Sequence, residues 1–105
     1  MKFRILDELV EMVGRVHSLA KTVGRHDGDL AKQMKRSSAS VGLNAGEALG
    51  GQKGNRTARL ESAMCSGRET TMALRISGAA GHLEGDEVKR IDRLVGGLYR
   101  LAYRT

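Results

Sequence analysis

Residues 36–49 read RSSASVGLNAGEAL, and small side chains occupy most positions of this stretch. Its few apolar residues continue a spacing of three to four that begins at Leu30, which predicts a helix over residues 30–49. Serine, alanine and glycine allow two helix axes to approach closely, while bulkier side chains on other helices fill the remaining core volume. We therefore expect this helix to pack tightly against a neighbouring helix.

Three further helices are expected. Residues 4–23 have the heptad seam of a bundle helix and an apolar side wide enough to contact a second subunit as well. Residues 57–83 have two apolar stripes, which predict two packing neighbours. The first runs through Gly67 and the second through Cys65, which is expected to be a small buried side chain. Residues 86–103 place Val88, Ile91, Val95, Leu98 and Ala102 on one side.

Short connections join these segments. Residues 26–29 (HDGD) and 84–87 (EGDE) are typical of turns, with Asp29 and Asp86 as the expected N-caps of the helices that follow. Helices joined by short loops pack as antiparallel neighbours. The predicted fold class is therefore all-α, an antiparallel up-down-up-down four-helix bundle.

Length and composition agree with one small helical domain, residues 1–105. Aromatic residues make up only 3% and tryptophan is absent, so the core is built from Leu, Val, Ile, Met and Ala. Cys65 is the single cysteine, which favours a reducing compartment. The sequence has no signal-like beginning and no apolar run of about 18 residues, so we expect a cytoplasmic protein with no membrane partner.

Positive charge is concentrated in the middle of the chain. The formal net charge is +6, and residues 30–83 alone have eight basic and three acidic side chains. Such an excess favours a polyanionic partner. The candidate nucleic-acid-binding residues lie on one side of the second helix and in a stripe along the fourth: Lys32, Lys35, Arg36, Lys89, Arg93, Arg100 and Arg104. Without aromatic side chains for stacking, we expect weakly selective contacts to the phosphate backbone; an ordinary solvated helix face is the alternative.

A polar stripe runs along one edge of the second helix, at Ser40, Asn44 and Glu47. Together with Glu69 on the third helix, these residues are expected to form a structural hydrogen-bond network, with Arg68 or Arg75 as counter-charge. A carboxylate pair for acid–base chemistry is the alternative, but no nucleophile accompanies it, so no catalytic residue is assigned and the protein is expected not to be an enzyme.

Two other kinds of site are not supported. The loop GGQKGN at residues 50–55 lacks the spacing of a phosphate-binding loop and follows no strand, so it is interpreted as a basic connector. A di-iron site in a bundle needs Glu-x-x-His repeats, and none occurs. Neither a metal site nor a cofactor is therefore predicted.

The run from Gln33 to Glu47 resembles the signature of the small "four helix bundle protein" family. In that signature a Gln-Leu-Arg-Arg element precedes small residues and then Ser-Ile-x-x-Asn-Ile-x-Glu; here Lys35 and Arg36 match the basic pair, and Ser40, Asn44 and Glu47 match the later positions. A second block is in register, with Glu69-x-x-x-x-Leu74 followed by Gly81-His82-Leu83, which is similar to the family's Gly-Tyr-Leu.

The resemblance covers essentially the whole chain, with departures. The family's proline between Ser40 and Asn44 and its aromatic-rich first helix are missing, His82 replaces a tyrosine, and the loop at 50–55 is richer in glycine. The family includes proteins encoded in 23S rRNA intervening sequences and accessory variability proteins of diversity-generating retroelements. The resemblance implies a homo-oligomer, a pentamer in the retroelement branch, with nucleic acid and a reverse transcriptase as partners. The alternative is a structural or protein-interaction oligomer with no nucleic-acid role.

Overall fold

The computed structural model describes residues 2–50 and 55–104, without the side chains of residues 2, 3, 94, 99 and 101–104. Four helices occupy this range: α1 (Lys2–Gly24), α2 (Gly28–Gly50), α3 (Arg56–Ala79) and α4 (Gly85–Arg104). No strand occurs in the described ranges, so the prediction of an all-helical chain with four helices is confirmed. The predicted loop at residues 50–55 lies largely outside the described residues.

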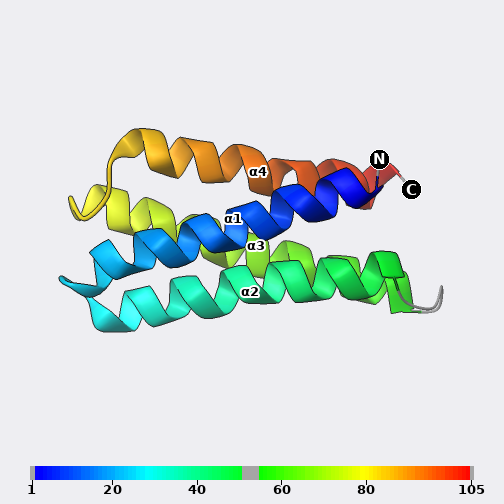
Figure 1. Ribbon diagram of the computed structural model, residues 1–105, viewed down its shortest axis with the longest axis horizontal. Coiled ribbons are helices and arrows are strands. Elements are labelled where there is room, and N and C mark those ends of the chain that lie inside the picture. Colours follow the sequence, from blue (N-terminus) through cyan, green and yellow to red (C-terminus); the bar gives the residue numbers. More distant parts are fainter. Residues whose placement is uncertain (1, 51–54, 105) are drawn as a thin grey trace.

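The helices lie lengthwise beside one another in a rod of 42 × 22 × 18 Å (Figure 1). Successive helices run in opposite directions along the rod, so the beginning of α1 and the end of α4 lie at the same end (Figure 1). The most extensive packing is between α2 and α3, followed by α1 and α2, whereas α4 packs more sparsely against α3 and α1. This order places α2 and α4 diagonally across the bundle.

Small residues are frequent at the buried positions of α2 and α3. On α2 the buried positions include Ala31, Ser37, Ser38, Ala45 and Ala48, and those on α3 include Ala63, Gly67, Thr70, Ala73 and Ser77. Bulkier buried side chains come from all four helices: Leu9, Met12, Val16 and Val23 on α1, Met34 and Val41 on α2, Leu60, Met64 and Leu74 on α3, and Val88, Ile91 and Leu98 on α4. Close approach of the two small-residue helices leaves volume that these larger side chains fill.

At the turn of residues 25–27, the residue that caps the following helix is not the expected one. Helix α2 begins at Gly28, and the Asp27 carboxylate accepts the Leu30 backbone N–H at 3.0 Å, so the N-cap is Asp27 and not Asp29. Helix α4 begins at Gly85, so the predicted cap Asp86 instead lies inside the first turn. There its negative charge still interacts favourably with the helix dipole.

Helix α3 ends earlier than predicted, at Ala79 rather than at residue 83. Gly81 has a φ of 80°, and its N–H donates to Gly78 O at 3.1 Å while the His82 N–H donates to Ser77 O at 2.8 Å. This pair of bonds is a Schellman motif, which needs a left-handed residue and therefore a glycine. His82 then stacks on His26 of the opposite turn, with ring centroids 4.6 Å apart.

The second apolar stripe of α3 is not buried, contrary to the prediction. Ala58, Cys65, Met72, Ile76 and Ala79 are all exposed, and the expectation of a buried Cys65 is wrong. Both neighbours of α3 pack against its other side, through residues such as Leu60, Met64 and Leu74, so the second stripe faces outward. By contrast, the broad apolar side of α1 is largely covered within the chain, although Val10 is 68% exposed.

Candidate nucleic-acid interface and polar network

Helix α2 presents a compact group of cations near its N-terminal end. Lys32, Lys35 and Arg36 are exposed, because the neighbouring positions Ala31 and Met34 turn toward the core. None of the three forms an ion pair with another described residue. We call these three residues the α2 cluster; their charges are free to meet an external anion.

Helix α4 presents a longer and thinner row of cations. Lys89, Arg93 and Arg100 are exposed and are likewise without an ion pair within the described residues, whereas the side chain of Arg104 lies outside them. Beside this row the helix has two glycines, and the Arg100 guanidinium lies over them: a Cβ at Gly97 would be 3.6 Å from Nη2. We call Lys89, Arg93 and Arg100 the α4 row.

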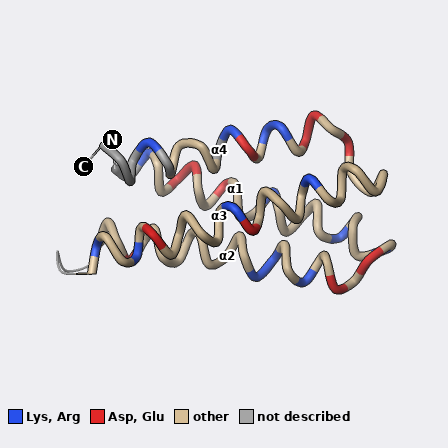
Figure 2. The backbone as a smooth tube through the Cα atoms, turned by 180° about the vertical axis from the view of Figure 1, so that it is seen from behind, with Lys and Arg blue, Asp and Glu red and all other residues tan. Residues whose placement is uncertain are grey.

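The structure does not join the α2 cluster and the α4 row into one surface. Their helices lie on opposite edges of the bundle, with α3 between them on the side shown in Figure 2. Acidic residues also alternate with the basic ones along the first half of α4 (Figure 2). A single chain therefore offers two separate basic areas, of which the α2 cluster is the denser.

The predicted polar stripe forms hydrogen bonds across the α2–α3 contact. The Ser40 and Ser66 hydroxyl oxygens are 2.7 Å apart, and Asn44 Nδ2 donates to Ser40 Oγ at 3.0 Å and to Ser40 O at 2.9 Å. Because Ser40 Oγ accepts from Asn44, its own proton is available to Ser66. The amide and the two hydroxyls thus satisfy one another where the helices touch.

Arg59, which was not an expected member, is the counter-charge at this network. Its Nη1 donates to Asn44 Oδ1 at 3.2 Å, and its Nε lies 3.9 Å from Glu47 Oε2. Of the two arginines that were expected here, Arg75 instead pairs with Asp92 of α4 at 3.5 Å. Glu69 is exposed and takes no part in these contacts among the described residues. Ser40, Asn44 and Glu47 are therefore brought together, and Glu69 is not.

A second polar contact lies deeper in the same interface and was missed entirely. Thr70 is completely buried; its Oγ1 lies 2.8 Å from both Ser37 Oγ and Ser66 O, and Ser37 Oγ donates to Met34 O at 3.4 Å. The sequence does contain a signal for this contact, because each of two facing helices has a hydroxyl residue, Ser37 or Thr70, at a core position. Buried hydroxyls of this kind need partners, so each predicts the other.

Replacing Thr70 by valine is expected to lower the free energy of unfolding by about 1–2 kcal/mol, because Ser37 loses a partner in a site closed to water. Urea unfolding followed by circular dichroism measures the change. The exposed Thr57→Val on the same helix is the matched control and should be nearly neutral. Adding Ser37→Ala to Thr70→Val should recover part of the loss; a wild-type midpoint for Thr70→Val alone would contradict the hydrogen bond.

Within the described part of the chain, no group of three or more His, Cys, Asp or Glu side chains is arranged to hold a metal ion. Across the same residues, no helix is both apolar enough and long enough to cross a membrane.

Comparisons with known proteins establish the fold. No protein-family model matches the chain, and no curated protein matches it significantly. A crystal structure of a protein of unknown function from the S23 ribosomal protein family of Bacteroides thetaiotaomicron is similar, with a TM-score of 0.84 over 95% of each chain. The two sequences are 21% identical, so the similarity shows a common helical-bundle fold.

Proposed function

We propose that this protein is a non-enzymatic, homo-oligomeric, up-down-up-down four-helix bundle that binds the backbone of nucleic acid. The observation that carries the proposal is the α2 cluster: three exposed cations within two turns of helix, none of them in an ion pair with a described residue. Unpaired surface cations bind polyanions because each neutralised phosphate releases condensed counterions. The α4 row would add contacts on another edge of the molecule.

Two further observations support a role of this kind. The chain resembles the four helix bundle protein family in the α2 stretch from Gln33 to Glu47, which includes two members of the α2 cluster. The structural neighbour from Bacteroides thetaiotaomicron is of unknown function, but it carries the name of a ribosomal protein family. On the basis of this resemblance, we propose that the chain assembles with its own copies; the retroelement branch of the family implies a pentamer. We also propose that it acts as an accessory protein of a reverse transcriptase.

Exposed apolar side chains support self-association. Val10 of α1 and Leu43 of α2 are 68% and 72% exposed, and burial against another subunit would add to a small, aromatic-poor core. These same residues favour the second candidate function, a structural or protein-interaction oligomer with no nucleic-acid role. Repetition of the α2 cluster around an oligomer would strengthen phosphate binding without any new contact within one subunit.

Binding to RNA and to duplex DNA should be measured by fluorescence anisotropy between about 50 and 200 mM salt. We expect weakly selective binding whose logarithmic salt dependence has a slope of about −3 or steeper, corresponding to at least three phosphates neutralised. Sequence-shuffled oligonucleotides should bind with similar affinity, because few aromatic side chains are present to stack on bases. Absence of any binding at low salt would reject this function in favour of the second candidate.

A further inference from the structure

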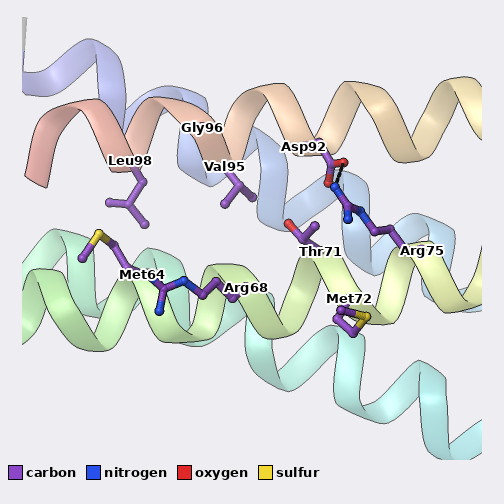
Figure 3. Close-up of a pocket in the computed structure, with 9 residues that line it drawn as sticks. All are labelled: Met64, Arg68, Thr71, Met72, Arg75, Asp92, Val95, Gly96 and Leu98. Atoms are coloured by element: carbon purple, nitrogen blue, oxygen red, sulfur yellow. Dashed lines mark hydrogen bonds and ion pairs between the residues drawn. The ribbon is translucent and has the colours of Figure 1, made fainter.

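An open groove of about 440 Å³ lies between α3 and α4. Its floor is apolar, formed by Met64 of α3 and by Val95 and Leu98 of α4, while the exposed Met72 lies at its outer edge (Figure 3). On α3 the lining extends over residues 64–75, a distance of about 16 Å at the rise of an α-helix. The groove is therefore long enough to hold about three turns of another helix.

The absence of a side chain at Gly96 keeps the groove open on the α4 side. A Cβ at Gly96 would meet only Arg100 Nη1, at 3.9 Å, so the space next to this residue is unfilled. Beyond the floor, the exposed side chains of Met72 and Ile76 continue the apolar surface along α3. Methionines are flexible and polarisable, which suits a surface that binds another helix.

Basic side chains flank this apolar floor. Arg68 and Arg75 lie two turns apart on α3, and both line the groove (Figure 3). On α4, Lys89 and Arg93 precede Gly96 on the same helical row and are exposed. Asp92 is the acidic residue of the lining, and Arg75 already pairs with it at 3.5 Å. With Asp92 matched by Arg75, the exposed Lys89 and Arg93 make the α4 edge of the groove positively charged.

At the end of the groove where Asp92 lies, one buried hydrogen-bond acceptor has no partner among the described residues. Asp92 Oδ2 is paired with Arg75, but the Asp92 Oδ1 atom is buried and has no hydrogen-bond partner among the described residues. A buried, unpartnered carboxylate oxygen is unfavourable until a donor reaches it. Because this oxygen is closed to the surface, it does not by itself provide an acceptor for a docked segment.

We propose that the α3–α4 groove binds an acidic amphipathic helix of a partner protein. Apolar side chains spaced three and four residues apart would lie on the apolar floor, and flanking carboxylates would meet the positively charged α4 edge. The apolar floor offers nothing to a nucleic acid. A second copy of this chain is disfavoured as the occupant, because its formal net charge of +6 would be brought against the exposed Lys89 and Arg93. This inference does not depend on the nucleic-acid function.

The test uses a fluorescein-labelled peptide of about 18 residues, long enough to form a helix on binding, with leucines in a heptad seam and glutamates beside it. Its control has the same composition in an order that gives no apolar face. We expect the full-length protein to bind the amphipathic peptide and to bind the control at least about tenfold more weakly, as measured by anisotropy. Equal affinities would mean attraction by charge alone and would overturn the proposal.

Gly96→Leu locates the site, because the new side chain fills the groove at a position with no close contact. We expect this variant to keep the wild-type melting temperature while losing at least about tenfold in peptide affinity. Gly46→Leu is the matched control, an equally open helical glycine on α2, and should bind the peptide as wild type does. Unchanged peptide binding by Gly96→Leu would overturn the proposal. So would a native oligomer that Gly96→Leu dissociates, since the occupant would then be a second copy.

Discussion

Replacement of Gly67 by leucine is expected to lower the melting temperature more than any other single substitution proposed for this bundle. Gly67 is buried in the middle of α3, and a Cβ there would stand only 2.9 Å from Val95 Cγ1 of α4. Val41 of α2 and Leu98 of α4 approach the same point to 3.9 and 4.0 Å. A leucine would therefore have to push α2 and α4 away from α3.

Overpacking of this kind costs about 2–3 kcal/mol, equivalent to roughly 10–20 °C in melting temperature for a domain of this size. Thermal unfolding followed by circular dichroism measures it. Val95→Ala in the Gly67→Leu background should restore part of the loss, because it removes the nearest atom. Gly46→Leu, where nothing lies within 4 Å of the new Cβ, should instead raise the melting temperature slightly. Wild-type melting of Gly67→Leu would show that α4 does not pack on α3 at this glycine.

The role of Gly67 is only half visible in the sequence. Its position in the first apolar stripe of residues 57–83 predicts a core location, and small residues at such positions predict a close helix contact. The partner was not predictable: the nearest atom belongs to Val95 of α4, not to the small-residue helix α2. Which neighbour comes nearest depends on the rotation of all the helices, and that is determined only when the whole core packs.

Apolar periodicity predicted that the four helices exist. The residues at which they begin and end depend on which of several nearby capping or terminating residues is used. HDGD contains two aspartates that can cap a helix, and spacing alone does not separate Asp27 from Asp29. At the end of α3, Leu83 continues the apolar spacing, so the pattern extends the helix. The left-handed conformation of Gly81 ends it instead, and glycine permits but does not dictate that conformation.

The polar network was predictable where its members share one helix. Ser40, Asn44 and Glu47 lie at spacings of four and three, which places them on one edge whatever the tertiary fold. Arg59 and Ser66 come from α3, and their approach depends on the register between two helices. The same register leaves Glu69 on the exposed side of α3. The register between two helices depends on how their side chains pack together, and the apolar periodicity within each helix does not determine it.

Lys32→Glu/Lys35→Glu/Arg36→Glu is expected to remove most of the proposed nucleic-acid binding. The three side chains are exposed and outside any ion pair with described residues, so the fold should melt within a few degrees of wild type. Loss of three phosphate contacts should weaken binding at low salt by at least about tenfold. The logarithmic salt slope should become shallower by about three. Anisotropy titrations with duplex DNA and RNA over a salt series measure both quantities.

The corresponding change on the α4 row, Lys89→Glu/Arg93→Glu/Arg100→Glu, controls for overall charge. Each triple variant reverses three cations, so each lowers the formal net charge from +6 by six, to zero. If the α2 cluster is the main contact, its variant loses clearly more affinity and more salt slope than the α4 variant does. Equal losses would show that nucleic acid responds to net charge and not to a surface on α2. Because α2 and α4 lie diagonally across the bundle, a duplex bound along α2 of one subunit would not cover the α4 row. Lys89 and Arg93 would then remain available to a helix bound in the α3–α4 groove.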